Sequence, residues 1–80
     1  MRGVLYLDEK DFDRALADLN KALQLSPNYD RAFYYRGLTY KSIGDSAKAI
    51  ADFKQAASLT KDTVLRQKAQ TELTKLGYIP

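Results

Sequence analysis

The sequence predicts an all-α fold, an antiparallel helix-pair solenoid, and three observations support this prediction. First, the chain repeats with a period of 34 residues: laying residues 2–28 over 36–62 gives nine identities in 27 positions, where unrelated segments would share about two. Second, apolar residues recur at spacings of three and four, which is the period of one helix face. Third, proline and glycine interrupt the chain only sparsely. A repeat of this length is typical of stacked supersecondary units that bury apolar faces against each other.

Composition excludes several classes of function. Eighty residues make one small domain, which is marginally stable alone. The chain has no cysteine and no histidine, so it lacks disulfides, thiolate zinc sites and the usual acid–base residue at neutral pH. The net charge of +3 is too weakly clustered for nucleic-acid binding. No apolar stretch is long enough to span a membrane, and the first nine residues do not form a signal peptide. We therefore expect no cofactor, no metal, no nucleic acid and no membrane, with a cytoplasmic location favoured.

The residues that start and stop helices predict five helices, near residues 1–9, 11–25, 29–43, 46–59 and 62–76. Asp11 is a credible N-cap for the second of these. The stretch 26–28, Ser-Pro-Asn, ends that helix because proline has no N–H and disfavours helical geometry in the residue before it. Gly44 ends the next helix and Asp45 caps the following one. A connection of two residues forces these helices to run antiparallel.

The last predicted helix has a single apolar face. Asp62 is expected to cap it, and its apolar residues follow at spacings of four, four and three: Leu65, Ala69, Leu73 and Leu76. A one-sided helix after a repeat array is typical of a capping helix, which keeps a solenoid soluble. Gly77 is a natural left-handed C-cap, after which Tyr78 is expected to pack back on Leu73.

Glycine occurs at equivalent positions inside two of the predicted helices. Gly37 costs about 1 kcal/mol of helix propensity relative to alanine, and the repeat places a second glycine, Gly3, at the equivalent position. This recurrence favours close approach of two helices over a merely weakened helix.

These residues give the chain a resemblance to tetratricopeptide repeats, whose units of this length are antiparallel helix pairs. The matching positions in the better unit are Phe33, Gly37, Tyr40, Gly44, Asp45, Ala49, Phe53 and Ala56. Departures include Arg36, where a leucine is common, and Ser46, where an aromatic is common. The resemblance implies a right-handed superhelix of about two and a half repeats: a truncated first repeat at 1–28, a full repeat at 29–61, a capping helix at 62–76 and a tail at 77–80.

The resemblance also implies a function in protein–protein interaction, with no enzymatic activity. The first helix of each pair lines a concave face on which partner peptides dock. The residues expected there are Val4, Leu7, Arg31, Tyr34, Leu38, Lys41 and Lys68. Tyr34 and Leu38 are predicted to be exposed unless something covers them; the alternative is that both pack into the core. Arg31 and Lys41 could attract an acidic peptide, although the full carboxylate clamp of some family members is absent.

Alternatives remain at this point. The partner is a protein or peptide, an acidic segment being one option. A structural role by self-assembly is the second hypothesis, because a missing half-helix would leave Leu5, Leu16 and Leu19 partly uncovered at the N-terminal edge. Catalysis is disfavoured because the acidic cluster at residues 8–13 coincides with a helix end and the next helix start, where the dipole favours carboxylates. Binding of RNA or an acidic membrane by scattered lysines is the weakest option.

Overall fold

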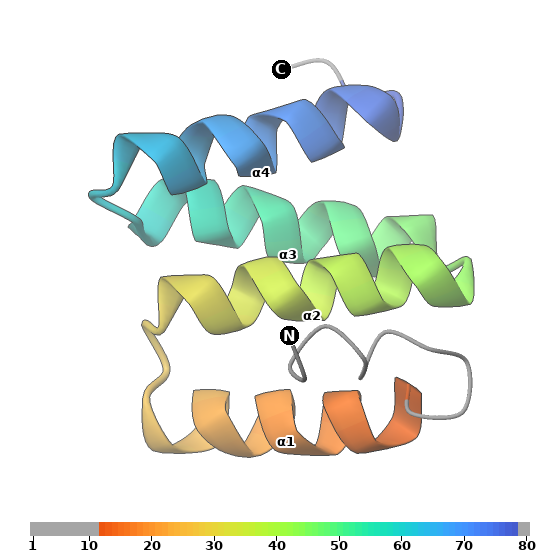
Figure 1. The fold of residues 1–80 in the computed structure, drawn as a ribbon, viewed down its shortest axis with the longest axis vertical. Helices are drawn as coiled ribbons and strands as arrows, with labels where there is room; N and C mark the ends of the chain where they lie inside the picture. The colour runs from red at the N-terminus through yellow and green to blue at the C-terminus, as the bar shows by residue number, and fades with distance from the viewer. Residues whose placement is uncertain (1–11, 79–80) are drawn as a thin grey trace.

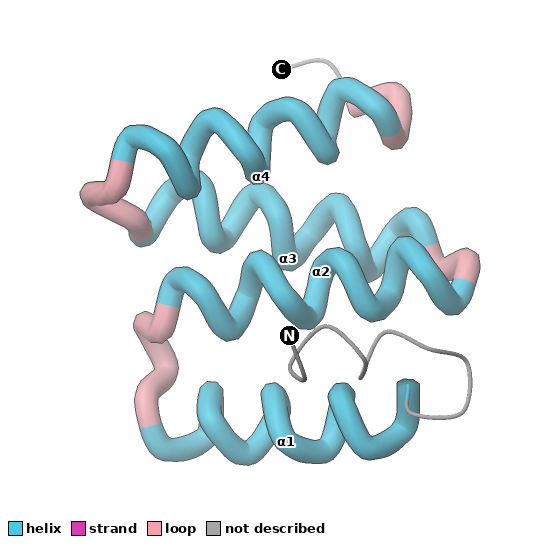
Figure 2. Tube along the Cα trace, viewed as in Figure 1, coloured by secondary structure: helices cyan, strands magenta, loops and turns pink. Residues whose placement is uncertain are grey.

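The computed structural model describes residues 12–78, and its fold is drawn in Figures 1 and 2. Four helices follow one another: α1 (Phe12–Leu25), α2 (Asp30–Ile43), α3 (Ser46–Leu59) and α4 (Thr63–Lys75). No strand occurs within residues 12–78. The predicted all-α fold is therefore confirmed. The predicted helix near 1–9 and the Asp11 cap lie outside the described residues.

The helices form a layered stack in chain order. Each packs on the one before it, α2 on α1, α3 on α2 and α4 on α3, with the most extensive contact between α2 and α3. Consecutive helices run in opposite directions (Figure 1). The predicted boundaries agree with the observed ones to within one residue. The last helix is one residue shorter at each end than predicted, because Asp62 serves as its N-cap and Leu76 already belongs to the turn that ends it.

The turn between α2 and α3 has the expected chemistry. Gly44 adopts a left-handed φ of 101°, and the Asp45 N–H then donates to the Tyr40 carbonyl at 2.9 Å while the Gly44 N–H donates to the Lys41 carbonyl at 3.1 Å. This pair of bonds is a Schellman motif. The Asp45 carboxylate accepts the Lys48 N–H at 3.2 Å. A helix stop and a helix start thus follow each other directly, which makes α2 and α3 an antiparallel pair.

The end of α4 is closed in the same way. Gly77 has a φ of 86°, and the Tyr78 N–H donates to the Leu73 carbonyl at 2.9 Å while the Gly77 N–H donates to Thr74 at 3.0 Å. Tyr78 packs against the core, as predicted. No helix within residues 12–78 has the length and apolar character needed to cross a bilayer.

The core lies between α3 and α4 and is closed by α2. Its buried members are mostly small: Ala49, Phe53, Ala56, Ala69 and Leu73. Phe53 is fully buried, and its ring lies so close to Gly37 that a Cβ on Gly37 would fall 2.8 Å from the Phe53 Cε1 atom. The close approach predicted from Gly37 is confirmed. The Phe53 ring occupies the space that a side chain at position 37 would need.

A charged network joins the first three helices and explains a departure from the family pattern. Arg36 donates from Nε and Nη2 to the two carboxylate oxygens of Asp52, each at 2.8 Å, and from Nη1 to the Asn20 side chain at 2.9 Å. Its guanidinium also lies 5.5 Å from the Phe33 ring centroid and 5.9 Å from that of Tyr40. The bond to Asp52 raises the pKa of Arg36 above its usual value. Arg36 therefore binds α3 and α1 at once, which the common leucine could not do by hydrogen bonding.

Candidate functional site: a groove between α2 and α4

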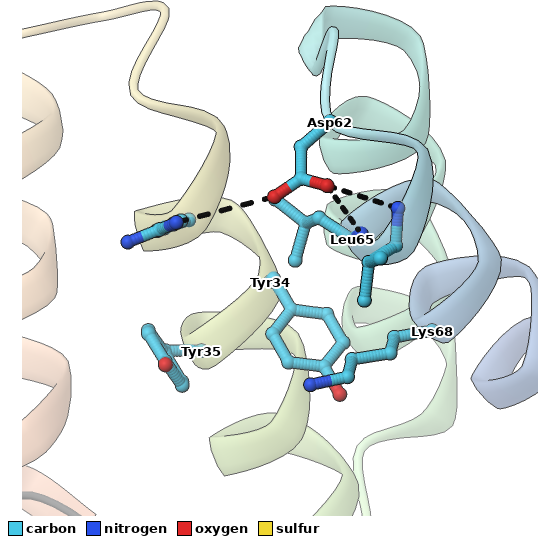
Figure 3. Close-up of a pocket in the computed structure, with 7 residues that line it drawn as sticks. Tyr34, Tyr35, Asp62, Leu65 and Lys68 are labelled. Atoms are coloured by element: carbon cyan, nitrogen blue, oxygen red, sulfur yellow. Dashed lines mark hydrogen bonds and ion pairs between the residues drawn. The ribbon is translucent and has the colours of Figure 1, made fainter.

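The described surface is hollowed between α2 and α4. Two cavities of about 280 and 450 Å³ adjoin each other there and share Tyr34, Val64 and Lys68. The first is completed by Arg31, Tyr35, Asp62 and Leu65, and the second by Gln67, Thr71 and Glu72. We call this combined surface the α2–α4 groove. Figure 3 shows its first cavity, with Tyr34 and Tyr35 projecting from α2 and Lys68 reaching toward Tyr34 from α4.

Tyr34 lies at the centre of the groove but is not free. Its ring centroid is 5.7 Å from that of Phe53 and 5.6 Å from that of Tyr35, and its side chain packs against the core. Burial raises the pKa of Tyr34, and the nearby negative charge of Glu72 raises it further. The phenol therefore stays neutral well into the alkaline range, and Tyr34 offers the groove only part of an aromatic face.

Leu38 departs further from the prediction. It packs half-buried against the same core and lines neither cavity. Tyr34 and Leu38 were expected to be exposed unless something covered them, and the core formed by α3 and α4 covers much of both side chains. For Leu38 the structure supports the alternative of a packing role.

Two exposed apolar side chains in the groove were missed as site residues. Tyr35 is 48% exposed and Val64 is 59% exposed, and both line the first cavity. The sequence carried a signal for each. Tyr35 follows another tyrosine on a polar helix, and Val64 stands beside the capping aspartate of α4 rather than at a position of its apolar stripe. Exposed aromatic and branched side chains grouped in a hollow are typical of an interaction site.

The end of the groove at Arg31 and Asp62, which we call its open end, carries cations that make only weak ion pairs. Arg31 approaches Asp62 at 4.0 Å with both side chains largely exposed, a geometry that contributes little binding energy in water. The other oxygen of Asp62 caps α4 by accepting the N–H groups of Val64 at 2.9 Å and Leu65 at 3.5 Å. Lys68 forms no ion pair with any residue between 12 and 78. Arg31 and Lys68 are therefore the cations that a ligand could engage here.

The opposite end of the groove is already neutralised. Lys41 on α2 donates a hydrogen bond to Glu72 on α4, and Lys75 approaches the other Glu72 oxygen at 3.9 Å. The Glu72 side chain is only 13% exposed. Lys41 lines neither cavity, so the structure does not bring it into the groove as the prediction expected.

A buried threonine holds the open end in shape. Thr60, in the turn before α4, is 2% exposed, and its hydroxyl oxygen accepts the Asp62 N–H at 3.0 Å. The Thr60 hydroxyl also lowers the pKa of the Asp30 carboxylate. In addition, Arg66 donates to the Thr60 carbonyl at 2.9 Å. The start of α4, which Asp62 caps, is thus fixed to this turn.

The remaining predicted site residues fall elsewhere. Val4, Leu7 and Leu5 lie outside the described residues. Leu16 and Leu19 are partly exposed on α1. Within residues 12–78, no cluster of three or more His, Cys, Asp or Glu side chains is arranged to hold a metal ion. The groove itself presents aromatic and aliphatic surface beside cations.

The chain is similar to known repeat proteins. The family model described as TPR repeat matches residues 3–44, and the model described as Tetratricopeptide repeat matches residues 30–63. Tetratricopeptide repeat protein 13 of Homo sapiens is 38% identical over 55 residues, covering 69% of this chain and 6% of that protein. The DnaJ homolog subfamily C member 7 homolog of Schizosaccharomyces pombe is 31% identical over 80 residues, covering 94% of the chain and 17% of that protein.

A third relative is sperm-associated antigen 1 of Homo sapiens, which is 29% identical over 75 residues, or 94% of the chain and 8% of that protein. The chain thus spans less than a fifth of the length of the curated relatives it matches. No solved structure matches it significantly. The helix pairs, the Gly37–Phe53 contact and the family matches agree, and the chain belongs to the tetratricopeptide repeat family.

Proposed function

We propose that this chain binds a segment of a partner protein in the α2–α4 groove. Tetratricopeptide repeats act as protein–protein interaction modules, so the partner is a protein or a peptide. The observation that carries the proposal is the exposure of Tyr35 and Val64 in a hollow beside Tyr34. Apolar side chains that remain exposed in a concave surface gain free energy when a partner covers them.

The charges around the groove favour a partner segment with some acidic character. Lys68 lacks an ion-pair partner within residues 12–78, and Arg31 is held only loosely by Asp62. A carboxylate on the partner would meet both cations at the open end. In this proposal the aromatic and aliphatic contacts supply most of the affinity, and the charges supply orientation and a faster encounter.

A binding experiment tests the proposal. The chain is immobilised and a random peptide display library is selected against it. The enriched peptides are then measured by titration against variants Tyr35→Ala and Val64→Ser. Each exposed side chain can be removed with little effect on the core, unlike Tyr34, whose truncation would also disturb Phe53. We expect both variants to weaken binding, with Ser58→Ala on the exposed part of α3 as a control that leaves binding unchanged.

Two results would count against the groove. One is binding that survives in the Tyr35→Ala/Val64→Ser double variant. The other is a set of amide shift perturbations confined to α1 and α3. Light scattering on the free chain separates this role from self-assembly. A monomer that binds peptide supports the groove, whereas a dimer or larger assembly supports self-assembly.

A further inference from the structure

We infer that Gln67 and Thr71 on α4 hold the main chain of the partner segment by hydrogen bonds, and that the segment therefore binds in an extended conformation. This inference rests on the proposed function and specifies how the partner is recognised. It follows from the hydrogen-bonding groups of the second cavity, from their spacing along α4 and from the length of the α2–α4 groove.

The second cavity contains two neutral side chains that are available for hydrogen bonding. Gln67 and Thr71 both line it, and both are exposed. Neither side chain forms a hydrogen bond with another residue between 12 and 78. Thr74, three residues further along α4, instead donates its hydroxyl to the Gln70 carbonyl at 3.0 Å. The amide of Gln67 and the hydroxyl of Thr71 can each donate to a ligand and accept from it.

The charges around this cavity indicate what these two groups bind. Glu72 is already paired with Lys41 and lies 3.9 Å from Lys75, so its charge is balanced. Lys68, which lines the cavity as well, is the cation that a partner carboxylate would meet. The neutral amide and hydroxyl are left for neutral polar groups of the partner. In any peptide the most regular of these are the main-chain N–H and C=O groups, one pair at almost every residue.

The spacing of the two side chains matches an extended main chain. Gln67 and Thr71 are four residues apart, which separates them by about 6 Å along the axis of α4. Alternate residues of an extended chain are about 6.6 Å apart. The two side chains can therefore bond main-chain groups of alternate partner residues. A helical partner could not use them in this way, because the N–H and C=O groups within a helix are already bonded to each other.

The groove also has the length of a short extended segment. Its lining residues on this side run from Asp62 to Glu72, which corresponds to about 15 Å of helix. At about 3.3 Å per residue, an extended chain covers that length with about four to five residues. Such a segment reaches from the exposed Tyr35 and Val64 in the first cavity to Thr71 in the second.

The experiment perturbs the main chain of the bound peptide directly. It uses a peptide enriched from the random display library whose binding depends on Tyr35 and Val64. The main-chain amides of this peptide are replaced one at a time by esters. Each ester removes one N–H and weakens the neighbouring carbonyl as an acceptor, while the side chains stay the same.

Every peptide is titrated against the native chain, Gln67→Ala and Thr71→Val. The matched controls are Gln70→Ala and Thr74→Val, which change exposed residues of the same helix that line neither cavity. Circular dichroism and thermal melting check that all the variants are as helical and as stable as the native chain.

We expect Gln67→Ala and Thr71→Val each to weaken the unmodified peptide by roughly twofold to tenfold, which is the range of one hydrogen bond. The two control variants should leave its affinity unchanged. In the native chain, esters at two positions that lie two residues apart should weaken binding by a similar factor. Each of these losses should disappear in the variant that lacks the bonding side chain, because the two changes remove the same hydrogen bond.

Three results separate the inference from the proposal on which it rests. Full affinity in Gln67→Ala and Thr71→Val, or ester losses of the same size in the native chain and in both variants, would overturn the inference while leaving the binding proposal intact. NMR of the labelled peptide showing a helix in the bound state would do the same. Failure of the library to yield any peptide that depends on Tyr35 and Val64 would overturn both.

Discussion

The Arg36 guanidinium on α2 binds both carboxylate oxygens of Asp52 on α3, with Nε–Oδ2 and Nη2–Oδ1 distances of 2.8 Å. The Asp52 side chain is only 7% exposed, so this two-bond pair lies at the margin of the core. Two parallel bonds between planar groups fix distance and angle together. They set the spacing of the helix pair whose first member carries Tyr34 and Tyr35.

Replacing Arg36 by leucine should lower the stability of the chain, because the loss of the ion pair outweighs the gain from the added apolar side chain. Arg36→Leu restores the residue common in the family but leaves the Asp52 carboxylate largely buried without its partner, a loss of about 2–3 kcal/mol. Urea unfolding of Arg36→Leu and Asp52→Leu should show both destabilised, with the Arg36→Leu/Asp52→Leu double variant less destabilised than the sum of the two. Strict additivity would show that the two side chains do not interact.

Bulk at Gly37 should also destabilise the chain. A Cβ there would lie 2.8 Å from Phe53 Cε1 and 2.9 Å from Cδ1, so Gly37→Leu gains helix propensity but forces the ring or the helix to move, at about 1–3 kcal/mol. Thermal melting measures the effect. Ser42→Leu is the control, because Ser42 is exposed on the same helix and a leucine there should not lower the melting temperature. A neutral Gly37→Leu would refute the close-approach argument.

The helices could be predicted from the sequence because their signals are local. The stop at Pro27, the left-handed glycine at Gly44 and the caps at Asp45 and Asp62 each act within a few residues. The repeat then confirms the register, since the same types recur one period later. Gly37 was interpretable for the same reason: its cost in a helix has to be offset by something, and a repeated glycine indicates packing.

The groove was harder to predict than the helices, because it depends on pairs of residues that are far apart in the chain. Lys41 and Glu72 are 31 residues apart, and no local pattern reveals that one neutralises the other. Whether Tyr34 is exposed depends on how Phe53 packs against it. The Arg36–Asp52 bond did leave a signal: the repeat conserves Arg2 with Asp18 and Arg36 with Asp52 at the same separation, although the identities alone do not say that the two residues touch.

The stability of the chain should depend on pH through Asp30. The Thr60 hydroxyl lowers the pKa of this carboxylate, so the contact stabilises the folded state above the usual pKa of aspartate and is lost as the pH falls through the lowered folded value. Thr60→Val should therefore be less stable than the native chain near neutral pH. The difference should narrow in acid but not vanish, because the Asp62 N–H also loses its acceptor.

Urea unfolding near pH 7 and about pH 3, on either side of the usual carboxylate range, measures this difference. Carbon-detected NMR titration should show the pKa of Asp30 moving up toward its usual value in Thr60→Val. Thr63→Val is the control, since Thr63 is exposed at the first turn of α4. A stability gap of the same size at both pH values would contradict the role of Asp30.

Substitutions of Asp62 should distinguish its two roles, as the N-cap of α4 and as a negative charge in the groove. Its carboxylate accepts the Val64 and Leu65 N–H groups and faces Arg31. Asp62→Ala removes the cap and should cost about 1 kcal/mol, whereas Asp62→Asn keeps an oxygen acceptor and should cost much less. Both changes release Arg31, so both should strengthen the binding of an acidic peptide enriched from the library by a similar factor, although their unfolding free energies differ. If affinity instead followed stability across the two variants, the Arg31 charge would have no part in recognition, and the loss of binding in Asp62→Ala would reflect fraying of the first turn of α4 beneath Val64.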